Sequence, residues 1–200
     1  MARHKLRIDG PAGKLETVID DPGAERRGLA LIAHPHPLYG GSLSNKVVTT
    51  LAKILYGKGY VAVRPNFRGV GASEGAYDEG RGEVADMRAV LDFVRERYPD
   101  MELVLAGFSF GAVVQSQLSM NIQPQHLLLV SPALNLFPMG AAPANTLVIH
   151  GERDELVPLE QVRAWTTQHS LRLAVVRGAD HFFNKKLAAL KQQVIEQCRC

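Results

Sequence analysis

The chain has 200 residues, a length typical of one domain with a sizeable buried core. Its formal net charge is only +3 and its Lys and Arg residues are spread along the chain, which excludes the dense basic patch of a nucleic-acid-binding protein. The sequence shows neither a signal-peptide core nor an apolar run long enough to span a membrane, so we expect a cytoplasmic protein.

The two cysteines, Cys198 and Cys200, are separated by one residue near the end of the sequence. A bond between them would close too small a loop to staple a fold, so no disulfide framework is expected. We expect a free, exposed pair, with redox or metal use as the alternative.

Strand-like and helix-like segments alternate along the sequence. Short apolar runs predict buried strands, and apolar residues repeating every three to four positions predict amphipathic helices. Asn45 is a suitable N-cap for one helix, and Pro99 follows the end of another. In chain order, we expect strands at 15–19 and 29–33, a helix at 46–56, a strand at 60–63, a helix at 83–98, a strand at 103–106, a helix at 112–120, strands at 127–130 and 146–149, a helix around 159–165, a strand at 171–176 and a helix at 185–197.

This alternation indicates an α/β fold, in which helices flank a central and mostly parallel sheet. The sequence contains no repeat, low-complexity stretch or interdomain linker. We therefore expect residues 1–200 to form a single domain.

The pentapeptide Gly107-Phe108-Ser109-Phe110-Gly111 lies between an expected strand and an expected helix. A serine on such a tight turn is lifted out of the sheet, and any side chain in place of the glycines would crowd the turn. Ser109 is therefore a candidate nucleophile, with backbone N–H groups nearby to hold an oxyanion. The alternative is a glycine-rich turn with an incidental serine.

A serine hydroxyl needs a base to attack, and the base needs an orienting carboxylate. In parallel α/β sheets, functional groups gather past the carboxyl ends of the strands. Asp154 follows one of the later strands, with Glu152 and Glu155 as fallback acids, and His181 follows the last strand. The order Ser109, Asp154, His181 is the one tied to the Gly-x-Ser-x-Gly turn.

Two other patterns suggest different chemistry. His34 and His36 are two residues apart and, with Asp154 or His181, form an alternative set of zinc ligands. The glycine-rich run at 69–75 departs from the dinucleotide-binding fingerprint and does not open a helix directly, so we interpret it as a shaped turn beside the site. We expect neither a metal nor a cofactor.

Together these motifs resemble the α/β-hydrolase superfamily, and especially its small bacterial members without a lid. The resemblance rests on His34-Pro35-His36-Pro37, the segments 64–75 and 150–154, the serine turn, and Gly178-Ala179-Asp180-His181. It implies a three-layer α/β-hydrolase fold without a lid domain. It also implies catalysis through an acyl-enzyme, with Ser109, His181 and Asp154 as the triad.

The same resemblance places the oxyanion donors at the backbone N–H groups of His36 and Phe110. Many members have His-Gly where this sequence has His34-Pro35, and proline has no N–H to donate. The segment 131–145, which carries three prolines and a glycine, is a poor candidate for a helical lid. We therefore expect an open site that prefers short acyl groups.

The expected function is hydrolysis of small or unhindered carboxylic esters. The partner is a small-molecule ester or thioester, with neither nucleic acid nor membrane involved. A thioesterase, a peptidase, a dienelactone-type hydrolase with the same triad, and a non-catalytic binding protein on this scaffold are the alternatives. The residues expected to line the substrate pocket are Leu38, Tyr39, Leu134 and Phe137, with Leu136 and Met139 as further candidates that otherwise pack on the core.

Overall fold

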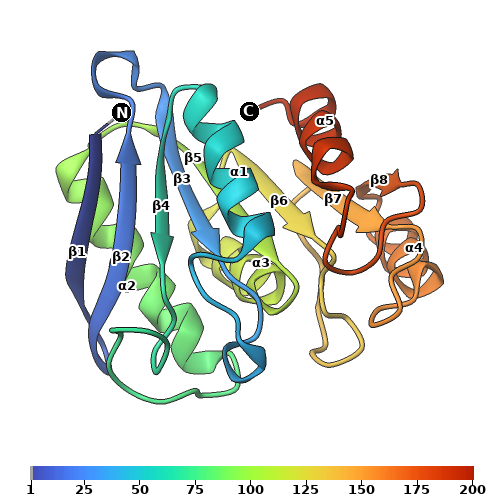
Figure 1. The fold of residues 1–200 in the computed structure, drawn as a ribbon, viewed down its shortest axis with the longest axis horizontal. Helices are drawn as coiled ribbons and strands as arrows, with labels where there is room; N and C mark the ends of the chain where they lie inside the picture. The colour runs from blue at the N-terminus through green and yellow to red at the C-terminus, as the bar shows by residue number, and fades with distance from the viewer. Residues whose placement is uncertain (1) are drawn as a thin grey trace.

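The computed structural model describes residues 2–200, and a single eight-stranded sheet runs through them (Figure 1). Its strands lie in the order β1-β2-β4-β3-β5-β6-β7-β8. β1 pairs antiparallel with β2 and β2 pairs antiparallel with β4, whereas all later neighbours are parallel. The strands are β1 (Ala2–Gly10), β2 (Gly13–Asp21), β3 (Gly28–Ala33), β4 (Tyr60–Pro65), β5 (Glu102–Phe108), β6 (His126–Val130), β7 (Thr146–Gly151) and β8 (Arg172–Val176).

Helices cover both faces of this sheet and give the three expected layers. The helices are α1 (Lys46–Gly57), α2 (Arg81–Arg97), α3 (Phe110–Ile122), α4 (Leu159–Gln168) and α5 (Leu187–Gln197), with short 3-10 turns at Gly23–Glu25 and Pro37–Tyr39. In Figure 1, α1 and α5 lie in front of the sheet, and α2, α3 and α4 lie behind it.

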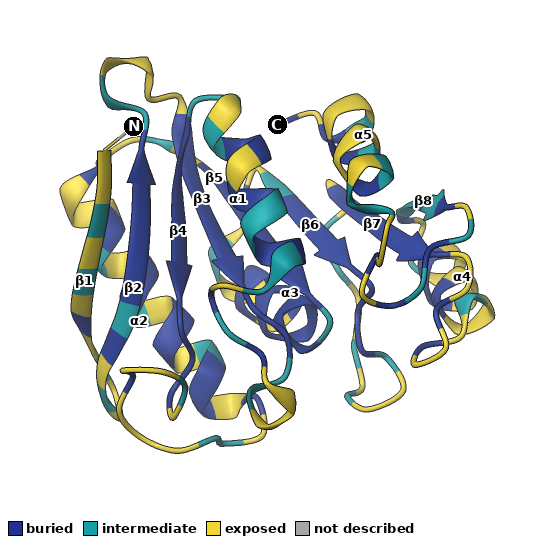
Figure 2. Cartoon of the chain, in the orientation of Figure 1, coloured by how far each residue is buried: buried dark blue, intermediate teal, exposed yellow. Residues whose placement is uncertain are grey.

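Each face of the sheet has its own apolar core. One core joins α1 and α5 to the front of the sheet, and the other joins α2, α3 and α4 to the back. Strands between two cores must be apolar on both sides, and β3 and β4 are buried along their whole length (Figure 2). This explains why those strands read as continuous apolar runs rather than as alternating patterns.

The elements at the two ends of the chain differ most from expectation. β1 was not predicted, and it forms an edge strand whose residues are largely exposed (Figure 2). The last helix begins at Leu187, two residues later than the sequence indicated. Within residues 2–200, no helix combines the length and the apolar character needed to cross a membrane.

The expectation of free, exposed cysteines is wrong. Cys198 and Cys200 are joined by a disulfide, and both are buried in the core in front of the sheet. The end of the chain turns back against α1, where the Lys58 Nζ donates to the carbonyl oxygen of Cys200 at 2.9 Å. Burial of the pair thus follows from where the chain end docks.

Candidate active site

Ser109 occupies a sharp turn between β5 and α3. Its φ is 55° and its ψ is −116°, a conformation that is strained for any residue with a side chain. A Cβ at Gly107 would overlap the carbonyl oxygen of Gly111, and a Cβ at Gly111 would lie 2.5 Å from the carbonyl oxygen of Ala33. The two glycines therefore let the turn close, and the Ser109 N–H is held by the carbonyl oxygen of Val130 at 2.9 Å.

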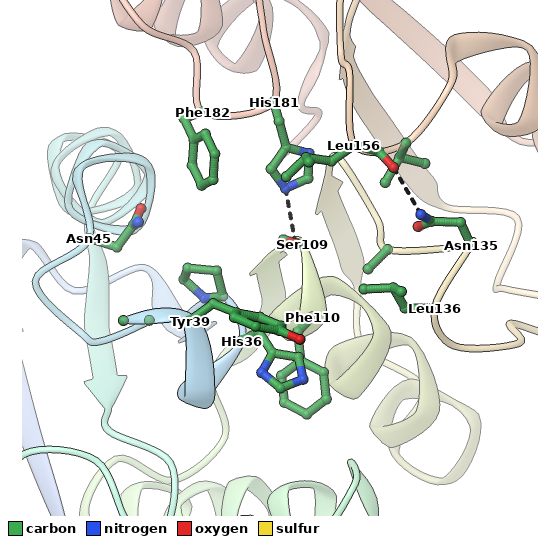
Figure 3. Close-up of a pocket in the computed structure, with 15 residues that line it drawn as sticks. His36, Tyr39, Asn45, Ser109, Phe110, Asn135, Leu136, Leu156, His181 and Phe182 are labelled. Carbon is green, nitrogen blue, oxygen red and sulfur yellow. Dashed lines mark hydrogen bonds between the residues drawn. The ribbon is translucent and has the colours of Figure 1, made fainter.

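Ser109, His181 and Asp154 form one hydrogen-bonded row. The Nε2 of His181 is 3.0 Å from the Oγ of Ser109, as Figure 3 shows, and its Nδ1 is 2.8 Å from the Oδ2 of Asp154. A carboxylate only accepts hydrogen bonds, so Nδ1 carries the proton in neutral His181. The Nε2 lone pair then faces the serine hydroxyl, as required of a general base.

The loop after β7 holds Asp154 as a buried carboxylate. Its Oδ1 accepts hydrogen bonds from the N–H groups of Leu156 at 3.0 Å and Val157 at 2.8 Å. Burial alone would raise the pKa of Asp154, but the hydrogen bond and charge of His181 and the Val157 N–H outweigh it and hold that pKa below its usual value. The group is therefore charged when His181 takes up a proton.

The two fallback acids point away from this row. The Glu152 carboxylate accepts the N–H of Gly178 at 2.7 Å, and Glu155 is exposed. Of the three carboxylates in this loop, Asp154 is the one that meets His181.

His181 is itself fixed by aromatic neighbours. The His181 side chain follows β8 and is almost fully buried. Its ring lies 5.3 Å from the ring of Phe108 and 5.0 Å from the ring of Phe182, measured between centroids. This packing limits rotation of the imidazole and keeps both nitrogens aligned with their partners.

The two expected oxyanion donors, Phe110 and His36, both lie near Ser109. Phe110 is the first residue of α3, so its N–H has no acceptor within the helix. The N–H of His36 has no hydrogen-bond acceptor among residues 2–200. His36, Ser109 and Phe110 all line one cavity (Figure 3).

The His36 side chain anchors this loop. Its Nδ1 accepts the N–H of Leu38 at 3.2 Å, and burial lowers its pKa, which favours the neutral ring. The ring packs at centroid distances of 4.7 to 6.0 Å against Tyr39, Tyr77, Phe110 and Phe137.

The His34 side chain also has a structural role. Its Nε2 accepts the N–H of Phe67 at 3.0 Å, and its Nδ1 lies 2.7 Å from the carbonyl oxygen of Pro35. With both nitrogens engaged, the ring has no lone pair left for a metal ion. Across residues 2–200, no group of three or more His, Cys, Asp or Glu side chains is arranged to hold one.

A cavity of about 430 Å³ opens above Ser109 (Figure 3). Tyr39 lines it as predicted, and so does Leu136, which was a further candidate. Leu156 and Phe182 also line it, although no sequence pattern indicated them. The segment 131–145 forms part of its wall and contains no helix, so nothing helical covers Ser109 from there.

Three residues predicted to line the cavity lie outside its lining. Leu38 is 67% exposed and points into solvent from the Pro37–Tyr39 turn. Leu134 and Phe137 are partly buried and pack on the apolar core behind the sheet, where Phe137 meets the ring of Phe110. These two follow the alternative left open by the sequence, which is packing of the segment on the core.

Comparison with known proteins agrees with the fold. Residues 38–145 match the family model described as serine aminopeptidase, S33. The chain belongs to the α/β-hydrolase superfamily. An uncharacterized protein of Rickettsia prowazekii is 35% identical to this α/β-hydrolase over 91% of the chain and 83% of that protein.

Solved structures of bacterial hydrolases superimpose on nearly the whole chain. A serine hydrolase without a lid from Xanthomonas campestris is 36% identical, with a TM-score of 0.91 over 98% of this α/β-hydrolase and 93% of that chain. An α/β serine hydrolase homologue from Coxiella burnetii is 41% identical, with a TM-score of 0.89 over 98% and 97%. Est1E of Butyrivibrio proteoclasticus, solved with ferulic acid bound, is 19% identical with a TM-score of 0.85 over 96% of both chains, and it shares the fold.

Proposed function

We propose that this α/β-hydrolase hydrolyses small, neutral carboxylic esters, with Ser109 as nucleophile, His181 as general base and Asp154 as the carboxylate that orients it. The observation that carries the proposal is the hydrogen-bonded row from Ser109 Oγ through both nitrogens of His181 to Asp154. A serine alone on a strained turn would not be activated. A serine that faces the lone pair of an oriented imidazole is activated for attack.

In the first half of the reaction, Ser109 Oγ forms a bond to the ester carbonyl carbon and its proton moves to His181 Nε2. The carbonyl electron pair shifts to oxygen, where the N–H groups of Phe110 and His36 are proposed to stabilise the negative charge. When the tetrahedral intermediate collapses, the bond to the leaving oxygen breaks. His181 gives its proton to that oxygen, and an alcohol leaves.

In the second half, water attacks the acyl-enzyme. His181 Nε2 takes a proton from the water as its oxygen bonds to the acyl carbon. Collapse of this intermediate breaks the bond to Ser109 Oγ, which recovers its proton from His181, and the carboxylic acid is released. Asp154 stays ionised throughout and stabilises the imidazolium form of His181.

The cavity supports a neutral substrate. None of its lining residues is an Asp, Glu, Lys or Arg, so neither a free amine nor a carboxylate of the substrate would find an opposite charge there. Four of its apolar lining residues, Tyr39, Leu136, Leu156 and Phe182, are solvent-exposed. An apolar acyl group can cover these surfaces without any segment closing over it.

A peptidase is the second candidate, because the matched family is described as a serine aminopeptidase. An aminopeptidase must bind the charged amino terminus of its substrate, and a carboxylate is the usual partner for such a group. The lining of the cavity above Ser109 includes no Asp or Glu, which favours an ester over an aminopeptide. We further propose a cytoplasmic enzyme that needs no cofactor.

The first experiment is covalent labelling with a fluorophosphonate probe. We expect the wild-type protein to be labelled rapidly at Ser109 and the Ser109→Ala variant to lose both labelling and hydrolysis. Ser44→Ala, which removes an exposed serine elsewhere, serves as the matched control and should behave as wild type. A wild-type protein that is not labelled would instead support a binding protein on this scaffold.

The second experiment defines the bond that is cleaved. Wild-type protein is assayed on p-nitrophenyl esters of acetate, butyrate, hexanoate and octanoate, on the matching acyl thioesters and on aminoacyl p-nitroanilides. The proposal expects kcat/KM to be highest on the esters. Higher kcat/KM on the anilides would make the peptidase the correct assignment.

A further inference from the structure

His150 is a buried titratable residue that the proposed reaction does not use. It lies in β7, one residue before the strand ends, and no part of it is exposed. Its Nε2 is 2.9 Å from the carbonyl oxygen of Val157. Among the described residues 2–200, its Nδ1 has no hydrogen-bond partner.

These contacts define the protonation of the ring. A carbonyl oxygen only accepts hydrogen bonds, so Nε2 carries the proton and the Nδ1 lone pair stays bare. A buried acceptor without a donor is unfavourable, and an apolar side chain of similar size would avoid it. A role in packing alone does not account for a histidine at this position.

Two hydrogen bonds link His150 to Asp154 through Val157. The carbonyl oxygen of Val157 accepts from His150, while the N–H of Val157 donates to Asp154 Oδ1 at 2.8 Å. His150 Nε2 is also 3.5 Å from Asp154 Oδ2, the oxygen that receives His181. Asp154 and Val157 belong to the loop after β7, whereas His150 belongs to β7 itself.

The charge state of His150 affects Asp154 because the two side chains lie close together. The titratable groups facing the His150 ring are Asp154 and, beyond it, His181. Burial lowers the pKa of His150. The nearby charge of Asp154 raises that pKa, and the charge of His181 lowers it. A second proton would sit on Nδ1 without an acceptor. The ring therefore stays neutral, and the negative charge of Asp154 is available to the imidazolium of His181.

We propose that His150 is a positioning residue for Asp154: its Nε2–H ties the loop at Val157 to β7 and fixes the carboxylate in the orientation that receives His181. The inference rests on the proposed function, because its readout is hydrolysis. It predicts a defect in the chemical step rather than in substrate binding, since His150 does not line the cavity.

The test compares His150→Phe, which keeps a ring but no donor, with His150→Gln, whose amide can still donate to Val157. We expect His150→Phe to lower kcat about 10- to 100-fold on p-nitrophenyl butyrate, with KM changed less than about threefold, because a misplaced catalytic group costs this much. His150→Gln should recover at least part of the lost kcat. Thermal unfolding of each variant checks that it folds, and His150→Leu, which also lacks a donor, replaces His150→Phe in every comparison if His150→Phe does not fold.

A double-mutant cycle separates this role from a general structural one. If His150 acts through Asp154, then His150→Phe should lower kcat less than about threefold in a protein that already carries Asp154→Ala. The inference would be overturned if His150→Phe lowered kcat by the same factor in both backgrounds. It would also be overturned if His150→Phe lowered kcat less than about threefold in the wild-type background. Rapid labelling of Ser109 in the wild-type protein would leave the proposed function standing in that case.

Discussion

The Nδ2 of Asn135 donates a hydrogen bond to the carbonyl oxygen of Leu156 at 2.8 Å (Figure 3). This bond joins the segment after β6 to the loop after β7. The same Leu156 donates its N–H to the Asp154 carboxylate at 3.0 Å, so one residue links the cavity wall to the proposed catalytic acid. Leu136 and Leu156, on the two joined loops, both line the cavity.

Asn135→Ala should therefore change the acyl preference of the enzyme. Without the bond to Leu156, the two loops separate more easily and the apolar wall is less well defined. A hydrogen bond of this kind contributes about 0.5–1.5 kcal/mol, so kcat/KM for a hexanoyl ester should fall about 2- to 10-fold. The kcat/KM for an acetyl ester, whose acyl group is the shortest of the series, should change less than about twofold.

Asn145 provides the matched control for this measurement. It bridges two loops in the same way, through the carbonyl oxygens of Pro124 and Gln125, but it does not line the cavity. Asn145→Ala should leave the ratio of hexanoyl to acetyl kcat/KM unchanged. If Asn135→Ala lowers kcat/KM equally for the hexanoyl and acetyl esters, then the hydrogen bond supports Asp154 and does not shape the acyl-binding wall.

Asp154→Asn should preserve the fold and remove most of the activity. The amide oxygen can still accept the N–H groups of Leu156 and Val157, but the amide NH₂ would face His181 and favour the wrong tautomer. In a serine protease the equivalent change lowers kcat about 10⁴-fold, and we expect a loss of similar order in kcat on p-nitrophenyl butyrate. The kcat of Glu152→Gln and of Glu155→Gln should stay within about threefold of the wild-type value. A larger loss of kcat in either variant would reassign the catalytic acid.

Gly107→Ala should destabilise the protein and lower its activity. The new Cβ would overlap the carbonyl oxygen of Gly111, so the turn that carries Ser109 must open. Overpacking of this kind costs about 1–3 kcal/mol in the free energy of unfolding, measured by urea denaturation. Gly57→Ala is the control, because its Cβ meets nothing within 4 Å at the end of α1, and it should be neutral or stabilising by up to about 1 kcal/mol. Equal stabilities for the two variants would show that the turn tolerates a side chain.

The parallel part of the sheet could be predicted because its signals are strong and local. Buried strands of this kind are short apolar runs, and β3, β5, β6 and β7 all lie where such runs occur. Once the strand ends are known, residues that follow them must gather at one edge of the sheet. That rule, together with the serine turn, predicts from the sequence that Asp154 and His181 lie beside Ser109.

β1 could not be predicted by the same rule. It is an edge strand, in which Leu6 and Ile8 face the core behind the sheet while Arg3, Lys5 and Arg7 alternate with them. A strand with one solvated face and a charged residue at every second position gives little apolar signal. Its stability comes from pairing with β2, which is a long-range property of the hairpin and not of the segment.

The cavity lining could be predicted only in part, because side-chain direction in loops depends on individual backbone angles. Leu38 and Tyr39 are neighbours of similar apolar character, yet only Tyr39 faces the cavity. Phe182 reaches the cavity from a loop in which the next residue, Phe183, has a φ of 54° and is fully buried. Composition cannot distinguish such pairs.

His34 should make the protein sensitive to mild acid. In the folded state its Nε2 accepts the Phe67 N–H, so a proton there would face another donor, and burial lowers its pKa from 6.5 to about 4. The folded protein therefore binds this proton less readily than the unfolded chain does. The resulting stability is fully present above pH 6.5 and is lost as the pH falls toward 4. The full shift corresponds to roughly 3 kcal/mol, at about 1.4 kcal/mol per pKa unit.

The test compares the free energy of unfolding of wild type and His34→Gln at several pH values. Glutamine can accept the Phe67 N–H without titrating, so the variant should be less stable than wild type at pH 7 but should lose less stability in acid. Between pH 7 and pH 4.5, wild type should lose roughly 2–3 kcal/mol more than His34→Gln. His4→Gln, at a partly exposed position in the edge strand β1, should follow the wild-type curve. Because His150 remains in both proteins, its own contribution cancels in the difference, and parallel curves for wild type and His34→Gln would show that His34 is not the acid-sensitive group.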